Sequence, residues 1–550
     1  MTFDPILPQD RIDAMVQAGM WDNRTIHDYM DEAVAANPDG VAITDFNSMT
    51  HRATTLSYRQ LQRIGDRMAL GLSAIGVGKG DVVAVQLPNW WHFAALYLAC
   101  MRLGAAINPL MPIFRHREMS FMLNFAEAKV VVVPRQFRGF DHPAMIRQIQ
   151  GECPALRQML VIDGDDEETA IEAVLINRRW EDELDAAQVF AKHKPTSHDI
   201  SELIYTSGTT GQPKGVMHTS NTLLVNVREV VRQVGLTGDD IILMSSPLAH
   251  NTGFLFGMLM PIMLKTKCVL QDIWEPVVAA QRIQDEGVTF TMGSTPFLSD
   301  ITNTDAVEQY DIRTLRTFIT AGAPIPRVLV QKAVEKYGFN VISGWGMSEN
   351  GLVTTTKTGD APEKVFGTDG TPVKGMAVRV VDEEGKVLPN LEEGRLQVRG
   401  ASNFVGYLKK PENYDMHDGD WFETGDNAFM DNDGYIRITG RSKDIIIRGG
   451  ENVPVVEVEE LLYRHPAVQD AAVVAMPDER LGERGCAFVS LKSGQSLSFQ
   501  EMVAYLQDNG MARNYLPERL ELVSDMPRTP SGKIQKFKLR EAAKELSQAS

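Results

Sequence analysis

The chain has 550 residues, enough for three to four units of about 150 residues and for several hydrophobic cores. Hydrophobic residues make up 43% and charged residues 23%, so wholesale disorder is excluded. The formal net charge of −17 disfavours nucleic acid as a partner, because a uniformly acidic chain repels a phosphate backbone. An anionic small substrate stays possible, but local positive groups must then bind it.

The four cysteines lie far apart and form no CxxC pair, which argues against a disulfide framework or a zinc site and is typical of a reducing compartment. No apolar run of about 18 residues occurs, so no membrane span is predicted. Residues 1–11 carry acids and prolines where a signal peptide has a basic and then an apolar segment. These features predict a cytoplasmic globular protein, and the length favours an enzyme.

Strand-like and helical patterns alternate through the first 170 residues. One apolar helical face is formed by Leu61, Ile64, Met68 and Leu72. The β-branched runs 82–87 and 130–133 each stop at a proline and predict buried strands, and the nearly all-apolar segment 93–100 predicts a buried helix. The acidic stretch 163–169 predicts a solvated loop. Strands separated by helices predict parallel sheets with crossover helices.

The last hundred residues predict a separate, smaller unit. Pro454 can occupy the first turn of a helix, and residues 471–475 predict a short strand. The apolar face of that helix is Val458, Leu461 and Leu462. Its positive end carries Glu457, Glu459 and Glu460. We therefore expect an N-terminal region of residues 1–440 and a C-terminal domain of residues 443–550.

The strongest chemical motif is Y-T-S-G-T-T-G-Q-P-K-G at residues 205–215. Its glycines let backbone N–H groups turn toward an anion, and its hydroxyls and Lys214 add donors for phosphate oxygens. The alternative is a flexible surface loop, but Pro213 beside Lys214 indicates a defined turn. No Walker A frame fits, so a P-loop kinase or ATPase is not favoured.

This motif resembles the phosphate loop of the adenylate-forming enzymes, which include acyl-CoA synthetases, peptide-synthetase adenylation domains and firefly luciferases. The resemblance continues in order from about residue 25 to about residue 539, through segments such as 76–84 and 394–400. It implies an α/β fold: a large N-terminal region of α/β sheets plus a distorted β-barrel, with a small mobile α+β C-terminal domain.

A second motif, S-G-W-G-M-S-E at residues 343–349, resembles the family segment that usually reads Y-G-x-T-E. In the family the aromatic lies against adenine, the hydroxyl bonds the α-phosphate and the glutamate helps to hold Mg²⁺. Here Trp345 keeps an aromatic face, Ser348 keeps the hydroxyl and Glu349 keeps the acid. The resemblance implies Glu349 and Thr206 as metal ligands. The alternative is structural, with the tryptophan in the core and the glutamate on the surface.

A third motif, W-F-E-T-G-D at residues 421–426, resembles the ribose site. By resemblance Asp426 accepts hydrogen bonds from both ribose hydroxyls, because a carboxylate can accept from two donors at once. Taken alone, T-G-D more often marks a surface turn. Arg441 resembles an arginine that contacts the nucleotide. Altogether the resemblance implies these residues for ATP or AMP: Thr206, Ser207, Gly208, Thr209, Thr210, Gly211, Lys214, Gly322, Ala323, Pro324, Gly344, Trp345, Gly346, Met347, Ser348, Asp426 and Arg441.

The tail motif P-R-T-P-S-G-K-I at residues 527–534 resembles the family's catalytic-lysine loop. Adenylation needs a cation there, because the carboxylate and the α-phosphate are both anionic and charge gathers on five-coordinate phosphorus. Lys533 would bridge the two and stabilise that transition state. A solvated terminus is the alternative. Lys443 matches the hinge about which the C-terminal domain of the family rotates, with one more solvated charge as the alternative.

The segment R-G-G-E-N at residues 448–452 resembles the loop that lines the pantetheine tunnel of coenzyme A, which implies CoA contacts from Arg448, Gly449 and Gly450. Pro454 lies one position earlier than the family pattern and departs from it. The segment also resembles the subgroup of cyclohexanecarboxylate and short- to medium-chain acyl-CoA ligases.

The acyl side is predicted around His250, which sits where the family has an aromatic or a histidine that gates the carboxylate. A lone histidine is otherwise more often structural. Gly253 and Met347 are expected to line the same pocket. Met258 and Met292 could join them as adaptable apolar groups, although methionines are more often plain core.

The resemblance implies a carboxylate–CoA ligase with ATP, Mg²⁺ and coenzyme A. The acid attacks the α-phosphate of ATP to give acyl-AMP and pyrophosphate, and the CoA thiolate then displaces AMP. The expected partners are these small molecules, with an alicyclic or short- to medium-chain acid. Three alternatives stay open: loading of a carrier-protein thiol, a luciferase-like oxygenase, and a binder without catalysis.

Overall fold

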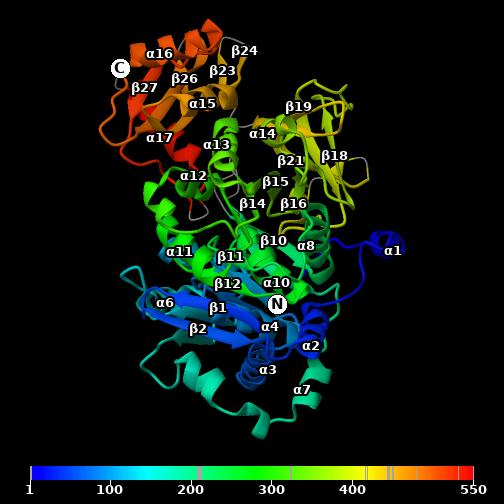
Figure 1. Cartoon of the computed structure of the whole chain (residues 1–550). Coiled ribbons are helices and arrows are strands. Elements are labelled where there is room, and N and C mark those ends of the chain that lie inside the picture. The colour runs from blue at the N-terminus through cyan, green and yellow to red at the C-terminus, as the bar shows by residue number, and fades with distance from the viewer. Residues whose placement is uncertain are drawn as a thin grey trace.

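The computed structural model describes residues 3–206, 213–322, 325–414, 416–417, 419–441, 446–448, 451–478, 480–529 and 532–548, with the backbone alone for residues 441, 451 and 452. The N-terminal half lies at the bottom of Figure 1, the middle of the chain above it, and the C-terminal elements at the top. No helix within these ranges is both long and apolar enough to cross a membrane.

The largest sheet carries the predicted nucleotide motif. Its central strands are parallel and its edges are antiparallel. In spatial order its strands are β17 (Thr371–Pro372), β16 (Gly351–Thr355), β15 (Asn340–Met347), β14 (Thr317–Ala321), β13 (Phe290–Gly293), β11 (Ile242–Met244), β12 (Cys268–Gln271), β1 (Val41–Asn47) and β2 (Arg52–Ser57). The carboxyl ends of β14 and β15 therefore lie side by side, and both point toward the C-terminal elements (Figure 1).

A second sheet of parallel strands ends in one antiparallel hairpin. In spatial order its strands are β10 (Lys214–Thr219), β9 (Ile200–Thr206), β4 (Ala106–Pro109), β3 (Val82–Val85), β5 (Val130–Pro134) and β8 (Gln158–Ile162). A short ribbon, β6 (Gln136–Phe137) with β7 (Phe140–Asp141), follows β5.

Helices fill three layers around these two sheets. One core cluster joins both sheets through helices between them, namely α2 (Ile26–Ala36), α3 (Tyr58–Ala74), α4 (Trp91–Arg102), α8 (Ser220–Val234) and α10 (Met260–Leu264). The outer face of the second sheet is covered by α5 (His116–Phe125) and α6 (His142–Ile149). The outer face of the first is covered by α11 (Pro276–Glu286), α12 (Thr295–Asn303) and α13 (Arg327–Tyr337).

Four further α-helices of the N-terminal region are short: α1 (Gln9–Gln17), α7 (Ala186–His193), α9 (Asn251–Gly253) and α14 (Pro362–Gly367). Two helices have π-type hydrogen bonding within the described residues, Glu172–Asn177 and Phe254–Leu259, and the second continues from α9 and is fully buried. α1 lies at the side of the molecule next to α8 (Figure 1).

A third, antiparallel sheet contains β18 (Met376–Val381), β19 (Gly394–Gly400), β20 (Met416–His417), β21 (Trp421–Met430) and β22 (Ile436–Arg441). Irregular register in β19 and β21 bends the strands, so the sheet curls around Phe404 and Phe422. This sheet supplies the distorted barrel that the sequence resemblance implies, and together with the two α/β sheets it confirms the predicted class.

The C-terminal elements form a fourth sheet with two cores of their own. Its strands are β23 (Ile446–Arg448), β24 (Glu451–Val453), β25 (Val468–Asp478), β26 (Gly482–Leu491) and β27 (Arg519–Leu522), and its helices are α15 (Val455–Arg464), α16 (Phe499–Asp508) and α17 (Lys536–Gln548). We call residues 446–548 the C-terminal unit. The predicted boundary between residues 440 and 443 stays a prediction, because residues 442–445 lie outside the described part.

The local predictions agree with the structure in type and differ in length. The predicted helical face lies in α3, where Leu61, Met68 and Leu72 are fully buried, and every residue from 93 to 100 is buried in α4. Strand β3 ends at Val85, two residues before the predicted end. The strand predicted at residues 471–475 is the middle of the longer β25, because pairing with β26 extends it in both directions.

Candidate active site

A cleft of about 1760 Å³ separates the end of the first sheet from the C-terminal unit. Both sides contribute to its walls, since α12 and α13 face α15 and the loop before α17 across it. Seven of the predicted residues line the cleft: Thr206, Gly322, Gly344, Trp345, Gly346, Asp426 and Lys533. Segments that are more than 300 residues apart in sequence therefore meet at one opening.

The phosphate motif lies at the turn between β9 and β10. Thr206 ends β9, Lys214 begins β10, and the two residues are opposite each other in the antiparallel register. The predicted residues Ser207, Gly208, Thr209, Thr210 and Gly211 lie outside the described residues. The ammonium of Lys214 sits 4.7 Å from the centre of the Tyr407 ring, a cation–π contact that keeps the lysine at the base of the hairpin.

Trp345 and Asp426 are joined directly across two sheets. The indole N–H of Trp345 on β15 donates a hydrogen bond to Oδ2 of Asp426 on β21, at 2.9 Å. Both side chains are largely buried, yet both border the cleft. The indole thereby orients the carboxylate that the resemblance assigns to ribose, a contact that a phenylalanine at residue 345 would not provide. Arg441 pairs with Asp426 in the β21–β22 register, and its side chain lies outside the described residues.

Glu349 follows β15 in a turn that several other segments hold in place. Tyr407 donates its hydroxyl to Oε1 of Glu349 at 2.7 Å, and the backbone N–H of Phe404 donates to the Glu349 carbonyl at 2.7 Å. Burial, and then the negative charge of Glu349, raise the pKa of Tyr407, so the phenol remains a donor. The carboxylate is buried and oriented, which contradicts the alternative of a surface glutamate.

The carbonyl of Ser348 accepts two further hydrogen bonds, from Nε2 of His218 at 2.7 Å and from Nδ2 of Asn251 at 3.0 Å. Burial lowers the pKa of His218 to about 4, so the ring is neutral and its single proton is on Nε2. Tyr407, His218 and Asn251 were given no role from the sequence, because their contacts with the Glu349 turn come from distant segments of the chain.

Lys533 reaches the cleft on a tight loop of the C-terminal unit. Thr529 closes the loop, since its N–H donates to the Lys533 carbonyl at 2.7 Å and its hydroxyl accepts from the Lys533 N–H at 3.0 Å. The ammonium end lies beside Gly322, which has a φ of +84°; a Cβ at Gly322 would be only 3.1 Å from Cε of Lys533. A glycine at this position therefore leaves room for the lysine at the end of β14.

His250 is the N-cap residue of α9, near enough to Lys533 for the lysine charge to act on it, and it is not among the residues that line the cleft. Burial, with a smaller contribution from the Lys533 charge, lowers the pKa of His250 to about 3. Its Nδ1 accepts from the N–H of Thr252 at 3.3 Å, so Nε2 carries the proton of the neutral ring. Residue 253 is a glycine because a Cβ at this position would be 2.2 Å from the carbonyl oxygen of Pro247. Met347, at the end of β15, is half-buried against the third sheet.

Several predicted residues lie outside the described part of the chain: Ala323, Pro324, Lys443, Gly449 and Gly450. Arg448 ends β23, and its guanidinium pairs with Glu518 at 2.7 Å within the C-terminal unit. The roles in nucleotide, acyl and CoA binding assigned to these residues stay predictions.

The chain matches the AMP-binding enzyme family over residues 30–408 and the AMP-binding enzyme C-terminal domain over residues 457–533. The first match alone spans more than half of the 550 residues. The chain belongs to the AMP-binding enzyme family.

This AMP-binding enzyme is similar to proteins of known activity along nearly its whole length. It is 35% identical to a medium-chain fatty-acid–CoA ligase of Escherichia coli (strain K12), over 97% of this chain and 93% of the relative. It is 31% identical to a 2,3-dihydroxybenzoate-AMP ligase of Bacillus subtilis (strain 168), over 98% of this chain and 97% of the relative. The crystal structure of the anthranilate CoA ligase AuaEII with anthranoyl-AMP matches it with a TM-score of 0.85 at 27% identity, over 96% of this chain and 98% of that one. The AMP-binding enzyme is thus an acid–thiol ligase of the acyl-CoA synthetase class.

Proposed function

We propose that this enzyme is an AMP-forming carboxylate–CoA ligase that converts an apolar acid, ATP and CoA to acyl-CoA, AMP and pyrophosphate. The observation that carries the proposal is the position of Lys533. Its ammonium lies beside Gly322, in a cleft that also contains the Trp345–Asp426 pair, and its charge acts on His250. A cation from the C-terminal unit thus lies in the same cleft as a ribose acceptor and an aromatic face.

The first step joins two anions, and this chain supplies the opposing charge. Asp426 accepts the ribose hydroxyls and Trp345 faces the adenine, so the α-phosphate projects toward Lys533. The ammonium then neutralises the acid's carboxylate and the α-phosphate as the new P–O bond forms and pyrophosphate leaves. The neutral ring of His250 adds no competing positive charge and can donate from Nε2 to the carboxylate.

The residues present fit Mg²⁺ as a partner of ATP. The predicted donors are oxygens, from the buried Glu349 carboxylate and the Thr206 hydroxyl, which suit a hard cation. Within the described residues, no group of three or more His, Cys, Asp or Glu could hold a metal alone. This suits a metal that enters with the substrate phosphates, where Mg²⁺ would supply charge neutralisation for the leaving pyrophosphate.

The second step requires CoA to reach the acyl-AMP from the C-terminal unit. We propose that the predicted C-terminal domain of residues 443–550, which contains this unit, rotates near Lys443 so that Arg448, Gly449 and Gly450 approach the cleft. Arg448 and Lys533 support the proposal, because they lie on different loops of one unit and only Lys533 lines the cleft in this arrangement. The thiolate then attacks the acyl carbonyl, and AMP leaves.

The residues on the acyl side favour an acid whose hydrocarbon part carries no charge. Beyond His250 the chain continues into the buried helix 254–259, and Met258, Met292 and Ile319 belong to one apolar core cluster with Phe254. A charged group on the acid would lose its hydration there without gaining a partner. We propose an alicyclic or a short- to medium-chain fatty acid as the substrate.

The test is a release assay with purified enzyme, ATP, Mg²⁺ and one acid at a time: octanoate, cyclohexanecarboxylate, benzoate or malonate. We expect pyrophosphate release with octanoate or cyclohexanecarboxylate, acyl-CoA only when CoA is added, and no reaction with malonate. Equal rates with malonate would contradict the proposed apolar acyl site. Adenylate formed without any transfer to free CoA would instead favour carrier-protein loading.

A further inference from the structure

Residues 3–25 precede the family match, which begins at residue 30, and take no part in the chemistry described above. We call them the N-terminal segment. They run along the backbone of residues 401–405. Trp21 donates its indole N–H to the Ala401 carbonyl at 2.9 Å. Arg11 donates to the carbonyls of Asn403 at 2.6 Å and Phe404 at 3.2 Å, and the Ile6 N–H donates to the Val405 carbonyl at 2.6 Å.

The segment that receives these contacts also holds the Glu349 turn. The hydroxyl of Ser402 donates to the Asn350 carbonyl at 2.8 Å, and the Phe404 N–H donates to the Glu349 carbonyl at 2.7 Å. Tyr407, three residues further on, donates to the Glu349 carboxylate at 2.7 Å. The peptide between Asn403 and Phe404 is therefore bonded on both sides: its carbonyl accepts from Arg11, and its N–H donates to the Glu349 carbonyl.

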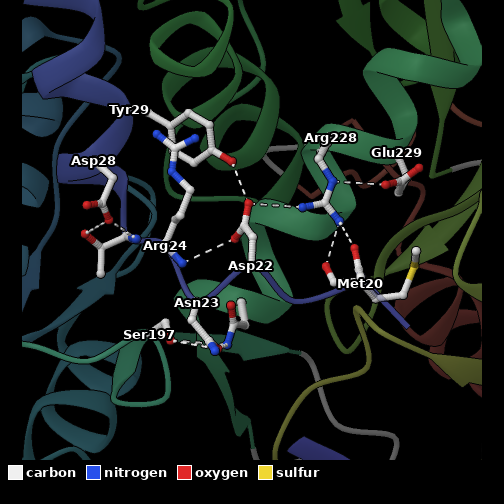
Figure 2. Close-up of polar contacts among 12 residues, drawn as sticks. Met20, Asp22, Asn23, Arg24, Asp28, Tyr29, Ser197, Arg228 and Glu229 are labelled. Carbon is white, nitrogen blue, oxygen red and sulfur yellow. Dashed lines mark hydrogen bonds and ion pairs between the residues drawn. The ribbon is translucent and has the colours of Figure 1, made fainter. Parts of the chain in front are cut away.

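The N-terminal segment is anchored to α8 independently of Arg11. Figure 2 shows Arg228 of α8 reaching Met20 and Asp22, with Glu229 beside it; the distances are 2.6 Å to the Met20 carbonyl and 3.2 Å to Asp22 Oδ2. Trp21 and Met20 add a small apolar core with Val225 and Ala401. Loss of one contact at Arg11 therefore leaves the segment attached elsewhere.

Arg11 is also close enough to the active-site turn for its charge to act there. It is one of the groups that lower the pKa of His218, after burial, and His218 bonds the Ser348 carbonyl. The guanidinium bonds the hydroxyl of Tyr414 at 3.1 Å as well, so one rigid planar group ties three acceptors behind the turn. A lysine offers a point charge and cannot match this fork.

We propose that Arg11 is a positioning residue, which fixes residues 403–404 and through them sets where the Glu349 carboxylate meets Mg²⁺ on ATP. The proposal rests on the role of Glu349 proposed above. A wrongly placed carboxylate weakens the part of ATP binding that depends on the metal, whereas Asp426 and Trp345 bind the nucleoside as before. A merely structural role would lower stability without separating these two parts.

The experiment measures ATP binding by calorimetry without acid, so that no turnover occurs, once with Mg²⁺ and once with EDTA. For Arg11→Gln we expect the gain in affinity on adding Mg²⁺ to fall about three- to tenfold, in line with the loss of one or two hydrogen bonds. Affinity in EDTA should stay unchanged. The control is Arg24→Gln, because Arg24 pairs with Glu32 at 2.6 Å and has no hydrogen bond to residues 401–405.

The proposal would be overturned if Mg²⁺ raised the ATP affinity of Arg11→Gln as much as it raises that of the wild type. It would also be overturned if Arg11→Gln lost ATP affinity equally with Mg²⁺ and with EDTA. Glu349→Gln separates this from failure of the proposed function. If Glu349→Gln loses the increase in ATP affinity caused by Mg²⁺ and Arg11→Gln keeps it, Arg11 has no positioning role. If Glu349→Gln keeps this increase, Glu349 is not the metal contact. Should Arg11→Gln fail to fold, Trp21→Phe, which removes only the donor to Ala401, carries the same test with a smaller loss expected.

Discussion

The indole of Trp345 helps to orient the carboxylate of Asp426, to which it donates a hydrogen bond at 2.9 Å. For Asp426→Ala we expect ATP binding to weaken by about 1–3 kcal/mol, because the ribose hydroxyls lose their acceptor. Calorimetry with ATP and no acid measures this. Trp345→Phe, which keeps a ring and removes the donor, should show a smaller loss of about 1 kcal/mol. An unchanged dissociation constant in Asp426→Ala would rule out the ribose assignment.

His250 is predicted to act on the acyl side of the site. Since His250→Ala removes a donor close to Lys533, we expect the Michaelis constant for the acid or the turnover to worsen by about tenfold, of the order of one lost hydrogen bond. The constants for CoA should move much less. Because the pKa of His250 is lowered to about 3, the ring stays neutral from pH 6 to 8, and the variant should keep the wild-type pH profile in that range. A change confined to CoA would contradict the gating role.

At the scale of single elements, strand β9 contains an unexpected acid. Glu202 is fully buried in its middle, and neither carboxyl oxygen has a hydrogen-bond partner among the described residues. Burial raises its pKa from 4.5 to about 8. The folded chain therefore keeps Glu202 protonated at neutral pH, whereas the unfolded chain ionises it. Its contribution to stability is complete below pH 4.5 and is lost as the pH rises through 8.

Glu202→Gln keeps the shape of the side chain and removes this proton linkage. We expect the melting temperature of the variant, relative to the wild type, to rise by a few degrees between pH 5 and pH 8. Scanning calorimetry or fluorescence at several pH values measures the difference. The exposed Glu167→Gln serves as the control and should show no such trend. A difference that stays flat with pH would mean that Glu202 is not a buried neutral acid.

A helix or strand can be predicted from the sequence when the interactions that form it lie within its own segment. Helix α4 and strand β5 were predictable, because continuous apolar runs can only be buried. The glutamates Glu457, Glu459 and Glu460 were predicted near the positive end of α15, and Glu457 lies in its first turn. Glu459 is buried and pairs with Lys536 at 2.7 Å, and Glu460 pairs with Arg437. Those partners are more than twenty residues away in sequence, so no pattern within the helix reveals them.

The residues of the active site also differ in whether the sequence alone reveals them. Trp345 and Lys533 stand in motifs whose glycines and spacing identify them without a structure. Tyr407 and Arg11 reach Glu349, directly or through one peptide, from opposite ends of the N-terminal region. Their roles arise from tertiary contacts alone, which a single sequence does not encode as spacing.

On the scale of the whole molecule, an ion-pair cluster joins the C-terminal unit to the rest. Arg437 of β22 pairs with Glu460 of α15 and lies 3.7 Å from Asp369, and all three side chains are largely buried. Breaking such a pair on one side is costly, because it leaves a buried charge without its counter-ion. The cluster therefore stabilises the arrangement in which Lys533 occupies the cleft.

Glu460→Gln should weaken that arrangement. We expect pyrophosphate release to slow by about tenfold, because the buried Arg437 loses its nearer counter-ion and keeps Asp369 at 3.7 Å. Thioester formation from supplied acyl-AMP should be unchanged or faster, because that step needs the other arrangement. Glu457→Gln, an exposed position on the same helix, is the matched control. Equal slowing of both half-reactions would show that the cluster does not distinguish the two arrangements.

The most direct measurement of the central claim uses Lys533→Ala and follows the two half-reactions separately: pyrophosphate release from acid and ATP, and acyl-CoA formation from synthetic acyl-AMP and CoA. Since Lys533 stabilises charge only while the P–O bond forms, adenylation should fall by about 10²–10³-fold. The thioester step should proceed at nearly the wild-type rate. If Lys533→Ala slowed both steps by the same factor, or neither, the division of labour proposed for the C-terminal unit would be wrong.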